Sequence, residues 1–491
     1  MKFSLIACID NTNGIGKDNN IPWNFSKDLT YFKKITTTNL DNTKINIVIM
    51  GNNTYKSIPD KYKPLPDRLN IILSRSVAST EKLPNLKTID KTLNDNKAIY
   101  FSEYINLLLY LNKNKNHINE VFIIGGKFIY ELFLKLRIIS TLYITKIEDY
   151  SFDCDIDLDI EKYQKQFKLT EQNIKYDKNK NNKILNVHKL NFCKYEYVNK
   201  EEIKYLKTIN KILKNGVYNL DRTNVGTLSI FGKSFSYDIR NYRLPLFTHR
   251  KMFIRGIIEE LLFFISGKTD TTILENKNVN IWKGNTSREF LDSRGLAHFK
   301  VGDMGAGYSF QLRHFGANYI NADTNYNGQG FDQLQYIINL IKTDPTSRRI
   351  MFSYWNPTDF HKTALLPCHI QYNFYINVET NELSCNFSMR GSDFILANNY
   401  NVCSCAILVF MLCHITGYKP GKIVINITNV HIYMNHIDET KKMIENKPLN
   451  FPLLYINDNE KKITNIEDFK YEDFKILFYN SYDKYKFNMA V

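Results

Sequence analysis

The chain has 491 residues, of which 43% are hydrophobic and 14% are aromatic. A chain of this length is too long to fold around one hydrophobic core, and the apolar content excludes extended disorder. We therefore expect a globular protein of two folding units. The formal charge of +15 would allow nucleic acid or small anions as partners. Because the excess of Lys and Arg is spread over both halves of the chain, we disfavour a nucleic-acid partner.

The eight cysteines show no CxxC spacing of the kind that binds a metal, so we expect reduced thiols and no metal. The N-terminal apolar run ends at Asp10, too early for a signal peptide. The longest apolar run, residues 402–413, is shorter than the roughly 20 residues that a membrane-spanning helix needs. It predicts a buried helix, and we expect a cytoplasmic protein without a membrane partner.

Residues 1–192 alternate short apolar runs with helical or loop stretches. Such runs, each flanked by helices, are typical of an α/β fold with a mostly parallel sheet that is covered on both faces. The predicted strands are residues 4–9, 45–50, 70–73, 121–124 and 141–145.

A helix is predicted after the first strand, because Asp28, Leu29 and Phe32 fall at helical spacing behind Ser26. Ser26 can cap this helix, which places Asp28 in its first turn. An acid in that place either complements the helix dipole or faces a pocket. Taken alone, the pattern favours the dipole interpretation.

Three further stretches of this half point to ligand binding. Residues 121–130 (VFIIGGKFIY) read as strand, paired glycines and helix, an arrangement in which backbone amides can approach a phosphate. Residues 48–58 repeat strand, glycine, polar turn and helix. Residues 64–75 place Arg68 and Arg75 on either side of a strand.

In this order and spacing, the four stretches resemble dihydrofolate reductase from Ser4 to about Leu190. The resemblance implies that Asp28 hydrogen-bonds the pteridine ring and assists protonation, in an apolar pocket that raises its pKa. It implies that Arg68 grips the glutamate carboxylate of folate, and that residues 16–23 form a loop that closes over the nicotinamide. The implied folate site comprises Ile6, Ala7, Asp28, Leu29, Phe32, Arg68 and Thr145, and the implied NADPH site Ala7, Ile15, Gly16, Gly51, Thr54, Ser74, Arg75, Gly125, Gly126 and Tyr130.

One departure from that family concerns the cofactor. Asn52 and Asn53 stand where the family usually has Arg or Lys beside the phosphates. Arg75 is then the remaining candidate to hold a 2′-phosphate, which favours NADPH over NADH.

A second unit is predicted after a polar stretch. Glu201, Glu202, Leu206 and Ile209 are spaced for an amphipathic helix. We place the first domain at residues 1–192, a short junction at 193–200 and the second domain at 201–491.

The second unit contains a cysteine among arginines. Cys368 follows an apolar stretch, and a free Cys is more often a small buried hydrophobe than a nucleophile. However, Arg222, the pair Arg348 and Arg349, and Arg390 each lie beside turn-forming residues. Clustered arginines suit a phosphate dianion, and their field would lower the pKa of the thiol so that the thiolate attacks.

Together with residues 259–262 (EELL), 281–282 (IW), Asn401 and 431–433 (HIY), these residues resemble thymidylate synthase, an α+β fold, from about Glu201 to Val491. The resemblance implies that Cys368 adds to C6 of dUMP, so that C5 attacks the methylene group of 5,10-methylenetetrahydrofolate. Glu260 would organise proton transfers, Tyr308 would assist removal of the C5 proton, and Asn401 would orient the pyrimidine. The implied dUMP site comprises Arg222, Arg348, Arg349, His369, Arg390, Asp393, Asn401, His431 and Tyr433, and the implied folate contacts are Trp282, Asp393 and Val491.

In that family two of the arginines, here Arg348 and Arg349, come from the partner subunit, which implies a homodimer. Departures from the family pattern are Met389 and Gly391 around Arg390, Ala397 and Asn399 before Asn401, and residues 306–312 around Tyr308. Cys368 and the four arginines are retained, so we expect a working synthase.

The main interpretation is an enzyme that makes dTMP from dUMP and recycles the released dihydrofolate with NADPH. One alternative is a working reductase whose synthase half serves mainly as a dimerisation scaffold, motivated by Met389 and Gly391. A second is a basic nucleic-acid-binding protein on old enzyme folds, because a fold does not fix a function.

Overall fold

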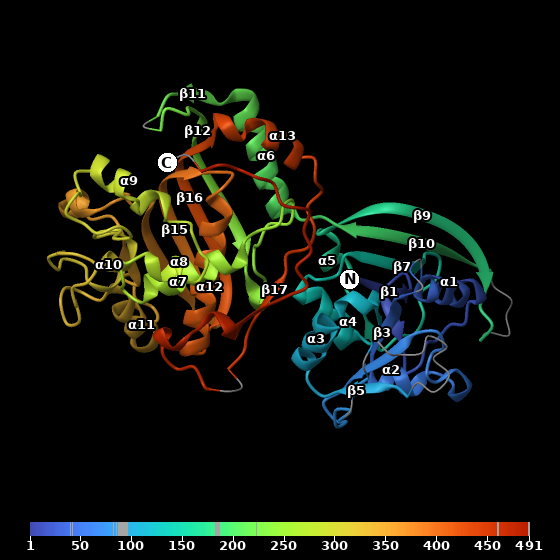
Figure 1. Cartoon of the computed structure of the whole chain (residues 1–491). Helices are drawn as coiled ribbons and strands as arrows, with labels where there is room; N and C mark the ends of the chain where they lie inside the picture. The colour runs from blue at the N-terminus through green and yellow to red at the C-terminus, as the bar shows by residue number, and fades with distance from the viewer. Residues whose placement is uncertain are drawn as a thin grey trace. The chain divides into compact units, whose positions relative to one another are not determined.

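A computed structural model describes the chain except residues 40, 42, 82, 85, 87–96, 182–186, 222, 459–460 and 490–491. The chain divides into two compact units, Met1–Asn199 and Lys200–Val491 (Figure 1). Strand β10 (Val187–Tyr197) is the last strand of the first unit, and helix α6 (Lys200–Asn215) opens the second.

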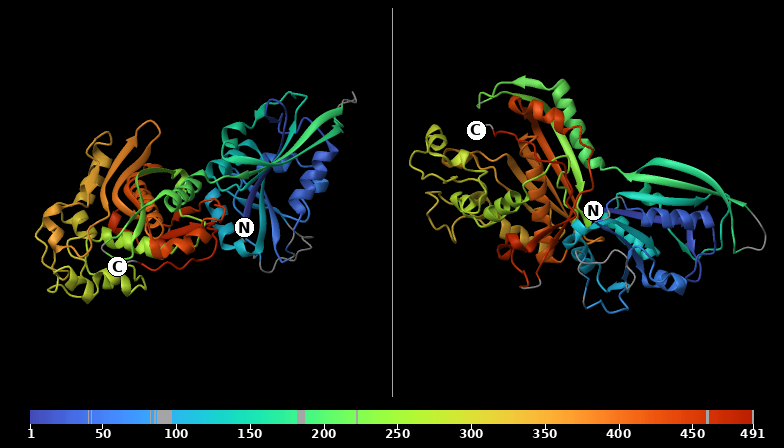
Figure 2. Two further views of the ribbon diagram at one scale, coloured as in Figure 1. Left: turned by 90° about the horizontal axis from the view of Figure 1, so that it is seen from above. Right: turned by 45° about the vertical axis from the view of Figure 1, so that its right-hand side comes forward.

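The first unit contains an eight-stranded sheet in the order β5-β4-β3-β6-β1-β7-β10-β9. The six strands from β5 to β7 are parallel, and β10 and β9 are antiparallel to their neighbours. All five predicted strands are confirmed, and their almost wholly apolar sequences match a sheet with helices on both faces (Figure 2). The strands are β1 Lys2–Ile9, β3 Ile45–Gly51, β4 Leu69–Leu73, β5 Ile99–Phe101, β6 Ile118–Gly125, β7 Thr141–Ile147 and β9 Phe167–Lys178, with a separate pair β2 Gly14–Gly16 and β8 Ile156–Asp157; the helices are α1 Ser26–Thr37, α2 Asn52–Ser57, α3 Tyr104–Lys113, α4 Lys127–Leu136 and α5 Glu161–Gln164.

Helix α1 carries Asp28 in its first turn, as predicted, but the predicted cap is wrong. Ser26 is the first helical residue, and Phe25 occupies the cap position without a side-chain hydrogen bond. The reason is packing, because Phe25 is buried with Trp23 and Ile147 in an aromatic cluster. That anchor fixes where the chain enters the helix.

The carboxyl ends of β3, β4 and β6 lie side by side because the three strands are parallel neighbours. Helix α2 follows β3 directly, and α4 follows the Gly125–Gly126 pair at the end of β6. Gly125 has φ +148°, and a Cβ there would lie 3.0 Å from Cγ2 of Thr54. Only glycine therefore fits at this edge, which is where open α/β sheets bind ligands.

The second unit is built on a six-stranded mixed sheet in the order β11-β12-β16-β15-β14-β13. Strands β15 and β16 are parallel, and the other pairs are antiparallel. A small pair, β17 and β18, stands apart from it. The strands are β11 Val217–Asn219, β12 Thr227–Asp238, β13 Met351–Ser353, β14 His369–Asn377, β15 Glu382–Asp393, β16 Lys419–Tyr433, β17 Leu453–Ile456 and β18 Phe474–Leu477; the helices are α7 Ile254–Ile265, α8 Thr272–Glu275, α9 Arg288–Ser293, α10 Tyr308–Arg313, α11 Gln333–Thr343, α12 Asn398–Thr416 and α13 Ile437–Met443.

Helix α12 contains the longest apolar run of the chain and packs on β15 and β16 (Figure 1). Among the described residues it is the one helix whose length and composition would allow it to cross a membrane. Its residues from Val402 to Cys413 are almost all buried in the core of the second unit. It is the buried helix that the sequence predicts.

Helix α6 is tied to residues 244–250 by one buried carboxylate. Glu202 is fully buried and accepts hydrogen bonds from the backbone amides of Thr248 (2.7 Å) and His249 (2.8 Å). It also accepts one from the Thr248 hydroxyl (2.8 Å) and lies 2.6 Å from Nδ1 of His249. The amphipathic spacing of this helix predicts its apolar face, but a buried acid on that face is visible only in the fold.

We expect Glu202→Ala to destabilise the second unit strongly, since it leaves buried amides of Thr248 and His249 without their acceptor. Each buried donor that loses its acceptor costs about 1–3 kcal/mol. Calorimetry of the full chain should show a large fall in the Tm of the transition that dUMP stabilises. The control Glu439→Ala, which removes the exposed pair with Lys442, should leave that transition in place, and an equal fall in both variants would contradict the assignment.

Candidate active sites

In the first unit, Asp28 is the acid of the predicted pterin pocket. Burial raises its pKa to about 6, and a hydrogen bond from the Thr145 side chain works in the opposite direction. Thr145 is itself buried and is paired in register with Cys8 of β1. The side chain of Asp28 keeps partial access to solvent, so a ligand can reach a carboxyl group that is otherwise in apolar surroundings.

The other predicted folate residues differ in exposure. Ile6 and Ala7 are buried in β1, Phe32 is half-buried, and Leu29 is 55% exposed. Arg68 is 3% exposed, and burial lowers the pKa of its guanidinium to about 10.

The Arg68 guanidinium is held by its neighbours. It donates to the carbonyl of Pro66 (2.8 Å) and to the hydroxyl of Thr36 (2.6 Å), and it lies over the ring of Phe32. The chain thus fixes the orientation of this fork before a carboxylate arrives.

The predicted cofactor residues gather at the carboxyl ends of the parallel strands. Tyr130 of α4 donates its hydroxyl to the carbonyl of Ile6 at 2.9 Å, which joins α4 to β1. Gly51 ends β3 beside Gly126, and Thr54 faces the two glycines. Ser74 follows β4, where its amide donates to Phe101 (2.9 Å). The structure therefore brings Gly51, Thr54, Gly125 and Gly126 together on one edge.

The loop at residues 16–23 is fastened to residues 150–157. Ile15 and Gly16 lie in or beside the β2–β8 pair. The buried Asp10 carboxylate accepts from the amides of Gly14 (2.7 Å) and Phe152 (2.7 Å). Nothing in the sequence marks Asp10 for this role, because one donor is 142 positions away.

In the second unit, Cys368 lies in a loop that two other site residues hold in place. Its backbone amide donates to the hydroxyl of Tyr308 (2.7 Å), and its carbonyl accepts from the amide of Arg390 (3.0 Å). The Arg390 guanidinium donates to the carbonyls of Pro367 and Leu366, both at 2.9 Å. A cationic side chain therefore wraps the segment that presents the thiol.

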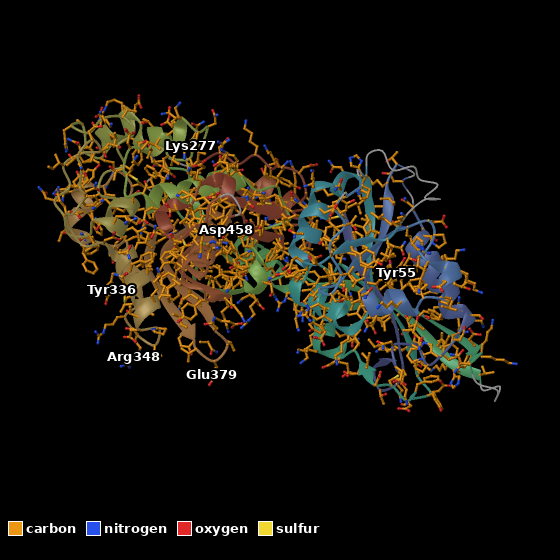
Figure 3. All side chains as sticks on the ribbon, turned by 90° about the horizontal axis from the view of Figure 1, so that it is seen from below. Tyr55, Lys277, Tyr336, Arg348, Glu379 and Asp458 are labelled. Atoms are coloured by element: carbon orange, nitrogen blue, oxygen red, sulfur yellow. The ribbon has the colours of Figure 1, made fainter. Side chains whose placement is uncertain are left out.

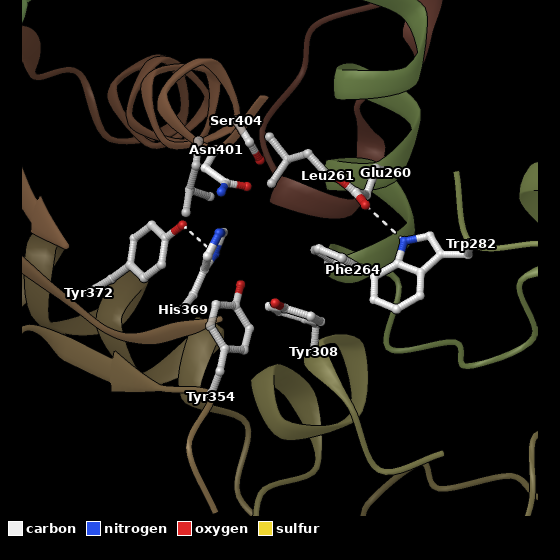
Figure 4. A pocket seen from close by; sticks show the side chains of 11 residues that line it. Glu260, Leu261, Phe264, Trp282, Tyr308, Tyr354, His369, Tyr372, Asn401 and Ser404 are labelled. Carbon is white, nitrogen blue, oxygen red and sulfur yellow. Dashed lines mark hydrogen bonds between the residues drawn. The ribbon is translucent and has the colours of Figure 1, made fainter. Parts of the chain in front are cut away.

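A cavity of about 50 Å³ lies beside this loop, and Figure 4 shows its lining. Side chains from α7, α10, α12 and β14 converge on it. Of the predicted residues, it collects Glu260, Trp282, Tyr308, His369 and Asn401. The remaining lining residues are Leu261, Phe264, Tyr354, Tyr372, Ser404 and Leu408. Leu261 and Phe264 share α7 with Glu260, and Ser404 and Leu408 share α12 with Asn401, whereas Tyr354 lies in a separate segment of the chain.

Glu260 is the acid of this cavity. Burial raises its pKa to about 7, while the hydrogen bond from Nε1 of Trp282 (2.8 Å, dashed in Figure 4) works in the opposite direction. A carboxyl group with a pKa near neutrality can both donate and accept a proton. The adjacent Glu259 instead bonds to Lys277 at 2.7 Å.

His369 is the imidazole of this cavity. Burial lowers its pKa to about 4, although a hydrogen bond with the Asn401 side chain opposes that shift. Its Nδ1 lies 3.0 Å from the Tyr372 hydroxyl (dashed in Figure 4). The imidazole is therefore neutral at physiological pH and orients the carboxamide of Asn401.

The departures near Arg390 and Asn401 have local consequences. Met389 is buried, and its sulfur accepts a contact from Nδ2 of Asn401 at 3.7 Å. Asn399 bridges to residues 245 and 247, since it accepts from the amide of Phe247 (3.0 Å) and donates to the carbonyl of Pro245 (2.9 Å). These contacts hold the first turn of α12, which carries Asn401.

The other predicted nucleotide residues lie around the end of β15 and β16. His431 stacks edge-on against Tyr433, and its Nδ1 is 2.8 Å from the Asn429 carboxamide. Burial lowers the pKa of His431. Asp393 accepts from the amides of Ile395 and Leu396, both at 3.0 Å.

Not all predicted residues join this site. Arg348 and Arg349 are exposed, and Figure 3 shows Arg348 at the periphery of the second unit. Arg222 and Val491 lie outside the described residues.

Two family models match the chain, Dihydrofolate reductase over residues 2–196 and Thymidylate synthase over residues 203–491. The chain is 38% identical over 496 residues to a bifunctional dihydrofolate reductase-thymidylate synthase of Paramecium tetraurelia, which covers 100% of this chain and 99% of that protein. For bifunctional dihydrofolate reductase-thymidylate synthase 2 of Arabidopsis thaliana the identity is 37% over 520 residues (100% of this chain and 88% of that protein). For one from Leishmania major it is 35% over 505 residues (100% and 95%).

The order of the two matches is that of the two units, and the relatives align along the whole chain. The first unit has the mostly parallel sheet and the second the mixed sheet with helices that the two resemblances imply. The chain therefore belongs to the bifunctional dihydrofolate reductase-thymidylate synthase family, and is an enzyme of dTMP synthesis with both activities.

Proposed function

We propose that residues 1–192 and 201–491, joined by residues 193–200, run one cycle. The synthase converts dUMP and 5,10-methylenetetrahydrofolate to dTMP and dihydrofolate, and the reductase returns dihydrofolate to tetrahydrofolate with NADPH. The observation that carries the proposal is a pair of partly buried acids, one in each unit: Asp28, whose pKa is raised to about 6, and Glu260, whose pKa is raised to about 7.

In the reductase, Asp28 is the ionisable group of the pterin pocket. Thr145 holds the carboxylate of Asp28, and Arg68 binds the glutamate carboxylate of the folate. The pocket is kept apolar by Ile6, Ala7, Leu29 and Phe32. The raised pKa of Asp28 supports this role, because a carboxyl group that titrates near 6 can share a proton with the pterin at neutral pH.

The edge formed by the ends of β3, β4 and β6 fits a dinucleotide. The two glycines leave room for a phosphate at the start of α4, and Thr54 and Ser74 supply hydroxyls beside it. Bound there, NADPH would supply the hydride. Ala7, Ile15, Gly16 and Tyr130 would flank the nicotinamide end, and Arg75 would bind the 2′-phosphate.

In the synthase, the Cys368 thiolate adds to C6 of dUMP, and C5 then bonds to the methylene carbon of the folate. Because that methylene becomes a methyl group while dihydrofolate leaves, the folate supplies the two electrons. Loss of the C5 proton precedes this transfer, and expulsion of the thiolate ends the reaction. Tyr308 and Glu260 serve the proton transfers, and Asn401 with His369 orients the pyrimidine.

Binding groups complete the proposal. Arg390 and Arg222 hold the dUMP phosphate, His431 and Tyr433 the ribose, and Trp282, Asp393 and Val491 the folate. The exposure of Arg348 and Arg349 supports their service to a partner's site in a homodimer. The protein is cytoplasmic, with no metal, membrane or nucleic-acid partner.

Asp28→Asn is expected to collapse dihydrofolate reduction at neutral pH, with partial rescue as the pH falls and substrate arrives protonated. In the unchanged protein the rate should rise as the pH falls toward about 6, since the raised pKa of Asp28 keeps it protonated below that value. Steady-state pH profiles test this. Asp177→Asn, which removes a nearby charge that raises the same pKa, is the matched control and should shift the profile to lower pH with turnover retained. Unchanged turnover of dihydrofolate by Asp28→Asn would contradict the assignment of Asp28 as the acid of the pterin pocket.

Cys368 is expected to form a covalent adduct with 5-fluoro-dUMP and methylenetetrahydrofolate, located by mass spectrometry. Because the thiolate is the nucleophile, Cys368→Ser should give no adduct and no dTMP while dihydrofolate reduction continues. A spectrophotometric assay with dUMP and methylenetetrahydrofolate, run with and without NADPH, shows whether both halves turn over. An intact protein that reduces dihydrofolate but forms no adduct would favour the scaffold alternative.

Gly391→Ser is expected to lower the KM for dUMP by a few fold and leave kcat nearly unchanged. A neutral hydrogen bond to the phosphate contributes about 0.5–1.5 kcal/mol, equally in ground and transition states. A Cβ at Gly391 would lie 3.6 Å from the Asn429 carbonyl, an ordinary contact. Gly391→Ala, which adds the carbon without the hydroxyl, should leave KM unchanged, and Arg390→Ala should raise it far more. Weaker dUMP binding by a folded Gly391→Ser enzyme would contradict the proposal.

A further inference from the structure

Arg75 and Phe128 approach each other across the carboxyl end of the reductase sheet. Arg75 follows β4, Phe128 lies in the first turn of α4 after β6, and β3 runs between these two strands. All three strands are parallel, so their carboxyl ends share one edge. The guanidinium carbon of Arg75 lies 5.6 Å from the centre of the Phe128 ring, within the range of a cation–π contact. The pair therefore spans the end of β3.

Arg75 is a cation with open donors at this edge. Asn52 and Asn53 at the end of β3 are neutral, and Asn53 donates to the carboxamide of Asn19 at 3.0 Å. The neighbouring cation, Lys127, is paired with Asp157 at 3.0 Å. Within the described part of the chain, the Arg75 guanidinium makes no ion pair or hydrogen bond, so all of its N–H groups can turn to an incoming anion.

Phe128 is a large apolar side chain that the fold leaves exposed, whereas such side chains are usually buried. Helix α4 buries Ile129, Tyr130 and Phe133, whereas Phe128 is 62% exposed. The helical register directs its ring away from the core, toward the segment that follows β4. Its close partner there is the guanidinium, which a ring face attracts through its quadrupole.

We propose that Phe128 is a positioning residue for Arg75: its ring holds the guanidinium over the end of β3 and thereby sets the preference of the reductase for a dinucleotide that carries a phosphate monoester. An unrestrained arginine side chain loses much rotamer freedom when it binds an anion, and a ring that already orders it reduces that loss. The inference rests on the proposed function, which assigns the dinucleotide to this edge.

The test compares kcat/KM for NADPH and NADH in the full-length enzyme. Phe128→Leu keeps an apolar side chain but removes the ring face, so the preference for NADPH should fall roughly two- to fivefold, the worth of an exposed cation–π contact. The value for NADH should stay unchanged. Phe128→Tyr keeps the ring and should behave as the unaltered enzyme. An equal loss with both cofactors would overturn the proposal in favour of packing or stacking on the nucleotide.

A double-mutant cycle separates this inference from the proposed function. Arg75→Ala should remove about tenfold or more of the NADPH preference, and Phe128→Leu should then have no further effect on it. If Arg75→Ala lowers the preference and Phe128→Leu does not, the role of Phe128 falls while the cofactor site stands. If Arg75→Ala leaves the preference intact, the assignment of Arg75 itself is wrong. Binding of 2′,5′-ADP and 5′-AMP by calorimetry gives the same comparison without turnover.

Discussion

Both candidate sites hold ionisable side chains whose pKa values are shifted mainly by burial. Removal of solvent disfavours the charged form of a group, so the same constraint moves acids and bases in opposite directions. Asp28 and Glu260 have pKa values raised to about 6 and about 7, whereas His369 is lowered to about 4. At neutral pH the two acids can exchange protons and the imidazole cannot. Burial is thus the main cause of these shifts, and the hydrogen bonds from Thr145 and Trp282 partly oppose it in the two acids.

The sequence predicts the elements of the first unit well because they are local. An apolar run such as that of β3 is buried along its whole length only in a sheet that is covered on both faces. The paired glycines before α4 indicate a place where another part of the protein or a ligand comes close to the backbone. The residue at which α1 begins is not determined by the local sequence. The buried ring of Phe25 decides it through contacts with residues far along the chain, so Ser26 is helical rather than a cap.

The candidate sites divide in the same way. Cys368, Asn401 and Glu260 stand in motifs by which the sequence identifies them, whereas Tyr354 joins the cavity only through tertiary packing. Where the chain departs from the family, side chains from other segments take over. Asn399 makes two hydrogen bonds to residues 245 and 247, and Met389 gives Asn401 a sulfur contact. The residues that contact such a substituted side chain cannot be predicted from the substituted position alone.

The order of strands β7, β10 and β9 has a consequence for how the protein is made on the ribosome. Strand β10 lies between β7 and the edge strand β9, although it is the last of the three to be synthesised. Until Tyr197 has left the ribosomal tunnel, β9 has no neighbour in the sheet and β7 presents an unpaired edge. The first unit therefore completes its sheet only after the start of α6 has already been added to the nascent chain. A polypeptide released before β10 was complete would expose the unpaired edge of β7, which is a template for pairing with other chains and hence for aggregation.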